Sequence, residues 1–85
     1  MAGQLPALTG RQLIRLLEKD GFAKTRQSRH GQAMTKTLSD GRILVTTIPN
    51  KRGDLTTGTL HAILGPKQTQ IGVEGLKELI TRYGK

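Results

Sequence analysis

The chain has 85 residues, which we interpret as one domain spanning 1–85, and it contains no cysteine, so disulfides and thiolate metal sites are excluded as supports for its small core. Fourteen Lys and Arg against six Asp and Glu give a formal net charge of +8, which favours a polyanionic partner such as nucleic acid. The alternatives are a basic surface that only keeps the protein in solution, and binding to an anionic membrane surface.

Phe22 and Tyr83 are the only aromatic residues, which is too few for a platform on which bases stack. Any bound nucleic acid should therefore be recognised through its backbone charge and its shape. Segment 1–10 lacks the charged and apolar regions of a signal peptide, and no run approaches the ~18 apolar residues of a membrane span. We expect a cytoplasmic protein without a membrane partner.

The first predicted element is a helix over residues 10–20. Thr9 is a typical N-cap, because its side-chain oxygen can accept a hydrogen bond from an amide of the first turn. Gly21 is a typical helix stop. The residues expected on the buried face of this helix are Leu13, Leu16 and Leu17.

Three strands are predicted next, over residues 22–27, 32–38 and 42–48. Lys24 and Arg26 alternate with their neighbours in the first strand, threonines favour the second, and β-branched residues dominate the third. The three strands should form an antiparallel meander. A turn at Ser39-Asp40-Gly41 separates the last two strands.

The last part of the chain predicts two helices. Pro49 ends the third strand and a polar, basic loop follows over 50–54. The helices are expected over 57–64, where Gly65-Pro66 ends the first, and over 72–83. The order α-β-β-β-α-α predicts an α+β fold similar to a double-stranded-RNA-binding domain, with the helices packed on one face of a three-stranded antiparallel sheet.

Several stretches, in this order, resemble the HicA (YcfA-like) family of toxins, and the similarity covers nearly the whole chain. The stretches are the leucine-rich helix 12–18 with its exit Asp20-Gly21-Phe22, the turn 40–42 with strand 45–49, and helix 57–64. The last is the most specific, because it carries a Gly-Thr-Leu-x-x-Ile-Leu pattern. The resemblance implies an mRNA interferase that is paired with a HicB-type antitoxin. The residues themselves indicate no cofactor.

In the family, the active histidine lies at the start of the second strand, usually within Gly-Ser-His. The corresponding region here reads Ser28-Arg29-His30-Gly31, so the resemblance implies that His30 is catalytic. A histidine with a pKa near 6.5 can act as general base or acid on RNA, whose 2′-hydroxyl is its own nucleophile. Without the resemblance, the alternative interpretation is a surface residue in a turn before Gly31.

Basic residues near His30 are candidates for binding RNA phosphates. On and between the predicted strands they are Lys24, Arg26, Arg29 and Lys36, and in the basic loop they are Lys51 and Arg52, for which a solvated loop is the alternative. We expect the antitoxin to cover a basic sheet face and to shield His30.

The other chemical groups favour plainer roles. Ser28 should form a hydrogen bond in a turn, and His61 should face solvent or cap its helix. The six carboxylates are scattered, so no metal site is expected. Two further functions remain open, a non-catalytic RNA-binding module of the same shape and a basic protein associated with DNA.

Overall fold

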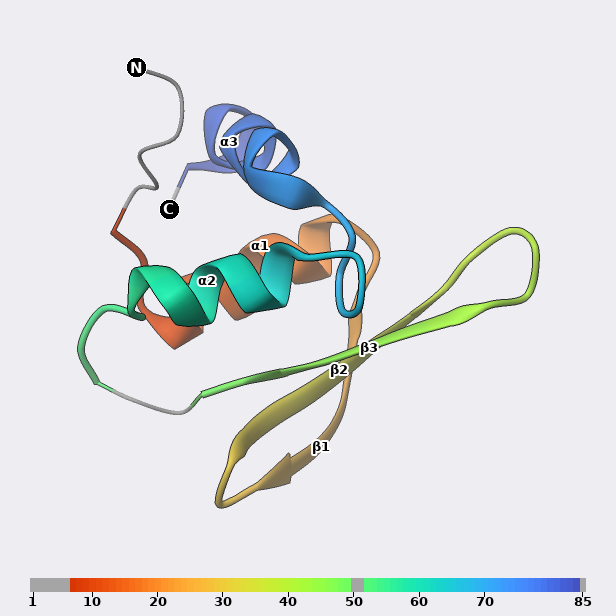
Figure 1. Ribbon diagram of the computed structural model, residues 1–85, viewed down its shortest axis with the longest axis horizontal. Helices are drawn as coiled ribbons and strands as arrows, with labels where there is room; N and C mark the ends of the chain where they lie inside the picture. Colours follow the sequence, from red (N-terminus) through yellow and green to blue (C-terminus); the bar gives the residue numbers. More distant parts are fainter. Residues whose placement is uncertain (1–6, 50–51, 85) are drawn as a thin grey trace.

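The computed structural model describes residues 7–49 and 52–84, and its order of elements is the predicted α-β-β-β-α-α (Figure 1). The elements are α1 (Gly10–Lys19), β1 (Ala23–Ser28), β2 (Gly31–Thr37), β3 (Ile43–Ile48), α2 (Thr57–Leu64) and α3 (Gly72–Tyr83). Every predicted element is confirmed, with boundaries that differ by one residue at most.

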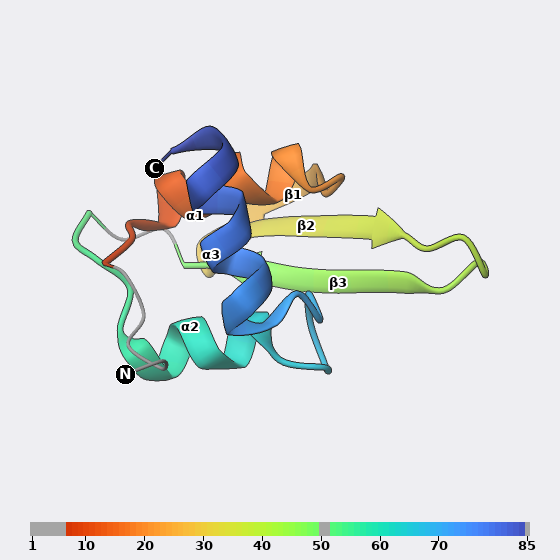
Figure 2. The ribbon, with the colours of Figure 1, turned by 90° about the horizontal axis from the view of Figure 1, so that it is seen from above.

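The three strands form an antiparallel sheet in the order β1-β2-β3, and α1 and α2 both pack against it. Figure 2 shows α3 crossing over α1 and α2, which makes a third layer, and α3 packs against both of these helices. This arrangement confirms the expected α+β class and is compatible with a double-stranded-RNA-binding-like fold. Within the described ranges, no helix is long and apolar enough to cross a membrane.

One apolar core lies between the sheet and the helices. It contains the three leucines predicted from the helix pattern, and all of its members are less than a tenth exposed. Its residues are Leu8, Leu13, Leu16, Leu17, Phe22, Met34, Ile48, Leu55, Leu60, Ile63, Leu64, Leu76 and Leu79.

The start of α1 is fixed by two sets of hydrogen bonds. In a capping box, Gln12 N–H donates to Thr9 Oγ1 at 3.2 Å, and Thr9 N–H donates to Gln12 Oε1 at 3.0 Å. Leu55 N–H donates to Leu8 O at 2.7 Å, beside a β-bridge between Thr9 and Asp54. The chain that follows β3 is therefore held next to the first turn of α1.

The sheet has one face under the helices and one open face. On the open face, β3 exposes Ile43 and Val45, whose exposed fractions are 61% and 52%, opposite Thr37 and Thr35 of β2. The expectation of a basic sheet face is therefore wrong, because apolar and threonine side chains occupy most of this surface. Lys36 of β2 pairs with Leu44 and lies on the helix side instead.

A β-bulge in β1 separates two predicted RNA contacts. Lys24 pairs with Met34 while Arg26 pairs with Ala33, so the register shifts between the two basic residues. At a bulge, two residues of one strand lie opposite one residue of its partner. Beyond the bulge, side chains of the bulged strand therefore point to the opposite face from the one that regular alternation would give. Lys24 therefore lies on the helix side and Arg26 on the open side, whereas regular alternation would have put both on one face.

Candidate functional site

His30 lies in the tight turn that joins β1 to β2. Ser28 pairs with Gly31 across the hairpin, which leaves Arg29 and His30 as the two exposed residues of the turn. The His30 N–H donates a hydrogen bond to Ser28 Oγ at 3.2 Å. Ser28 therefore has the turn-stabilising role expected for it, and His30 directly precedes the second strand.

Gly31 allows two large side chains to occupy this turn. Its φ is +136°, a conformation that residues with a Cβ rarely adopt, and it is buried. A Cβ at this position would collide with the backbone carbonyl of Ile48. Gly31 thus takes up the unusual backbone geometry, and the chain at Arg29 and His30 keeps negative φ values.

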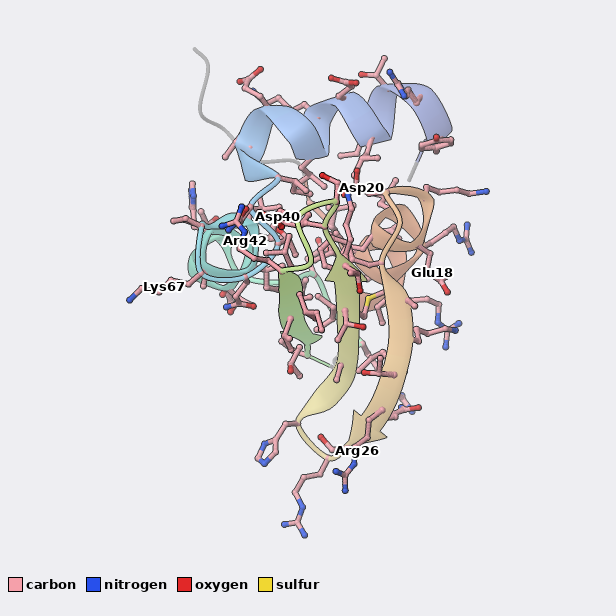
Figure 3. The ribbon with its side chains drawn as sticks, turned by 90° about the vertical axis from the view of Figure 1, so that its right-hand side faces the viewer. Glu18, Asp20, Arg26, Asp40, Arg42 and Lys67 are labelled. Carbon is pink, nitrogen blue, oxygen red and sulfur yellow. The ribbon has the colours of Figure 1, made fainter. Side chains whose placement is uncertain are left out.

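The end of this hairpin is cationic. Arg26, Arg29 and His30 are all exposed, and none of them forms an ion pair with any residue in 7–49 or 52–84. Figure 3 shows Arg26 at the end of the sheet farthest from the helices, away from the labelled carboxylates Glu18, Asp20 and Asp40. A phosphate that approaches His30 would therefore meet positive charge without a competing carboxylate.

Lys36 lies near the other end of β2, six residues and thus roughly 20 Å along the strand from His30. Its Nζ donates to Asp20 Oδ2 at 3.1 Å and lies 5.7 Å from the centre of the Phe22 ring. The structure does not bring Lys36 to the His30 turn, and its charge is already paired.

Lys24 has a weaker partner. Its Nζ lies 3.9 Å from Glu18 Oε2, and both side chains are about half exposed. An exposed pair at this distance contributes little free energy, typically ~0–1 kcal/mol. A phosphate could therefore replace Glu18 as the partner of Lys24.

A groove of about 750 Å³ lies on the helix side of the β1–β2 hairpin. Its walls are the start of α1, the paired strands and the chain after β3. The lining residues are Thr9, Gly10, Arg11, Ile14, Lys24, Gln27, Gln32, Ile48, Pro49 and Arg52. Two of the predicted RNA contacts, Lys24 and Arg52, thus come together here, while Lys51 lies outside the described residues.

Sequence reasoning missed Arg11, Gln27 and Gln32 as members of a site. Arg11 is an exposed residue on an amphipathic helix, a pattern that also describes any solvated helix face. The signal that unites it with Lys24 and Arg52 is tertiary, because the three residues come from α1, β1 and the chain after β3.

The remaining candidates lie apart from both the turn and the groove. His61 is exposed on α2, as expected, and Figure 3 shows Lys67 projecting away from the sheet beside α2. Within the part of the chain that the structure describes, no three His, Cys, Asp or Glu side chains are grouped as a metal ion would require.

Comparison with known proteins gives one family. A family model described as HicA toxin of bacterial toxin-antitoxin matches residues 10–71, from the start of α1 to the residue before α3. No curated protein and no solved structure matched the chain. The family match covers most of the chain and includes the β1–β2 hairpin, α2 and all the lining residues of the groove except Thr9. The chain therefore belongs to the HicA family of toxins from bacterial toxin–antitoxin systems.

Proposed function

We propose that this toxin is an endoribonuclease that cleaves mRNA, with His30 as its acid–base group, and that a HicB-type antitoxin neutralises it. The proposal rests on the position of His30 in the β1–β2 turn of a chain that belongs to a family of toxins. His30 is an exposed residue of the turn directly before β2, next to Arg29 and in the same hairpin as Arg26, and no carboxylate in residues 7–49 or 52–84 pairs with either arginine.

The chemistry needs one proton-transfer group and positive charge. The RNA 2′-hydroxyl oxygen attacks the adjacent phosphorus, the bond from phosphorus to the 5′ oxygen breaks, and a 2′,3′-cyclic phosphate and a 5′-hydroxyl are formed. The imidazole of His30 accepts the proton of the 2′-hydroxyl and returns it to the departing 5′ oxygen. Arg29, the neighbour of His30 in the turn, stabilises the charge that develops on the phosphate, and Arg26 adds positive charge from the open side of the hairpin.

The proposed partner acts by covering the turn. A toxin with a net charge of +8 attracts an acidic protein as well as RNA. An antitoxin bound over Arg29 and His30 would block the imidazole and remove the cationic end of the hairpin from RNA.

The test is expression of the chain alone, beside a His30→Ala variant and a matched His61→Ala control. Both histidines are exposed, so neither change removes a core contact. We expect growth arrest and loss of mRNA from the parent chain and from His61→Ala, and neither effect from His30→Ala at equal protein level. Co-expression of a HicB-like protein should restore growth.

Two results would contradict this function. Equal toxicity of the parent chain and His30→Ala would remove His30 from the chemistry. Binding of RNA without any loss of mRNA would favour a non-catalytic RNA-binding module, with His30 as an ordinary turn residue.

A further inference from the structure

We propose that the groove on the helix side of the hairpin binds the backbone of single-stranded RNA, and that Arg11, Lys24 and Arg52 hold its phosphates while the scissile phosphate lies at His30. This inference rests on the proposed ribonuclease function and extends it. It places the RNA between α1 and the hairpin, on the opposite side of the sheet from Ile43 and Val45.

The charges of the groove favour a polyanion. Arg11, Lys24 and Arg52 line it from three different segments, and none of the described lining residues is an Asp or Glu. Arg11 and Arg52 form no ion pair within residues 7–49 and 52–84, and the contact from Lys24 to Glu18 is long, at 3.9 Å. Three largely unpaired cations around one hollow would attract successive phosphates.

The size and lining of the groove favour a single strand. About 750 Å³ suits a few nucleotides, whereas a duplex is much wider. The two aromatic residues of the chain do not line it, so the groove lacks a surface on which bases stack. We therefore infer contacts to the backbone, with little dependence on base sequence.

The groove leads directly to the turn. Gln27 and Gln32 line it and are paired across the hairpin, and the next pair, Ser28 with Gly31, closes the turn that holds His30. The Gln32 side chain braces this wall, because its Nε2 donates to Arg26 O at 3.1 Å and to Ala33 O at 3.0 Å. An RNA backbone in the groove thus has only one more residue pair of the hairpin to pass before it reaches the turn that holds His30.

The position of Arg52 depends on the contacts at the start of α1. The Thr9–Asp54 bridge and the bond from Leu55 N–H to Leu8 O hold the chain after β3 beside the first turn of α1. Gly10 allows this close approach, because a Cβ there would collide with the carbonyl of Pro49. Backbone contacts therefore hold the segment that carries Arg52 beside the segment that carries Arg11.

The test measures RNA binding by the full chain with the background change His30→Ala, so that the RNA stays intact. Affinity for a short fluorescent single-stranded RNA is measured at several salt concentrations. In this background, Arg11→Ala should weaken binding roughly fivefold near 0.1 M salt, since each lost phosphate contact reduces the slope of log K against log salt by about 0.7. Arg11→Lys should retain most of the affinity.

Arg15→Ala is the matched control, because Arg15 is an exposed arginine of the same helix that does not line the groove. It should change the affinity less than twofold. An equal loss of RNA affinity in Arg11→Ala and Arg15→Ala would contradict binding in the groove, since RNA affinity would then depend only on the overall charge. Weaker capture of a HicB-type antitoxin by Arg11→Ala, with RNA binding unchanged, would also overturn it.

The two proposals fail separately. If the parent chain cleaves RNA but Arg11→Ala and Arg15→Ala bind RNA with equal affinity, RNA does not bind in the groove and the ribonuclease function stands. If the parent chain cleaves no RNA while Arg11→Ala still loses affinity selectively, the function is wrong and the groove binds RNA without cleaving it.

Discussion

The β1–β2 hairpin and the β2–β3 hairpin both project beyond the helices (Figure 1). Each holds an arginine at or beside its turn. Arg42, beside the second turn, donates from Nε to Asp40 Oδ2 at 2.8 Å. Arg29, in the first turn, has no carboxylate partner in the described chain. The two hairpins therefore offer different surfaces to a polyanion, although each carries an arginine.

The same contrast runs along β2. Lys36, at the end toward the second hairpin, is paired with Asp20 from the end of α1. At the beginning of β2, the described carboxylates form no pair with Arg26 or Arg29. Net charge measures the overall attraction for RNA, but the pairing of each cation decides where on the surface a phosphate can bind.

The largest expected effect is a difference in stability between variants at a glycine in each of the two hairpins. Gly31→Ala should lower the free energy of unfolding by about 3 kcal/mol, because it combines left-handed strain with a collision against the Ile48 carbonyl. Gly41→Ala should cost only about 1 kcal/mol, because Gly41 also has a positive φ but open space around it. Urea denaturation measures both values, and equal losses would contradict the close packing at Gly31.

The next effect compares the two arginines. Arg29→Ala should weaken binding of single-stranded RNA roughly fivefold near 0.1 M salt, the effect of one lost phosphate contact. Arg42→Ala should change it less than twofold, because Asp40 already neutralises Arg42. Both are measured by fluorescence titration in the His30→Ala background. A larger loss of RNA affinity for Arg42→Ala would indicate that RNA binds at the β2–β3 hairpin, which would contradict binding at the β1–β2 turn.

The smallest effect compares two ion pairs of α1. Asp20→Asn should lower the free energy of unfolding by about 1 kcal/mol, because the pair with Lys36 is short and its side chains are less than a third exposed. Glu18→Gln should leave stability unchanged within error and raise RNA affinity about twofold, because it frees Lys24. Thermal melts and titrations check both, and unchanged RNA affinity in Glu18→Gln would argue against Lys24 as a contact.

Local patterns in the sequence predicted every helix and strand. The leucines of α1 recur at helical spacing, Thr9 begins the helix, and the residues of β3 favour an extended chain. Each of these signals acts over a few neighbouring residues, so it can be read without knowing the fold. The position of His30 beside the start of β2 follows from the same local signals.

Local sequence patterns could not predict which basic residues lie together in the folded chain. The bulge between Lys24 and Arg26 changes the face of the sheet on which each lies, and no residue type in β1 requires a bulge at that point. Arg11 and Arg52 come together because backbone contacts join segments far apart in the chain. Their proximity depends on tertiary packing, which a local pattern does not contain.

The sequence by itself determined the family resemblance, the strong positive charge and the order of helices and strands, because these depend on composition and on short-range spacing. Only the tertiary structure decided which cations are free. Lys36 is paired because the end of α1 brings Asp20 to it, while the β1–β2 turn extends past the helices and leaves Arg29 and His30 exposed. The sites open to a phosphate are thus set by which carboxylates folding brings beside each basic residue.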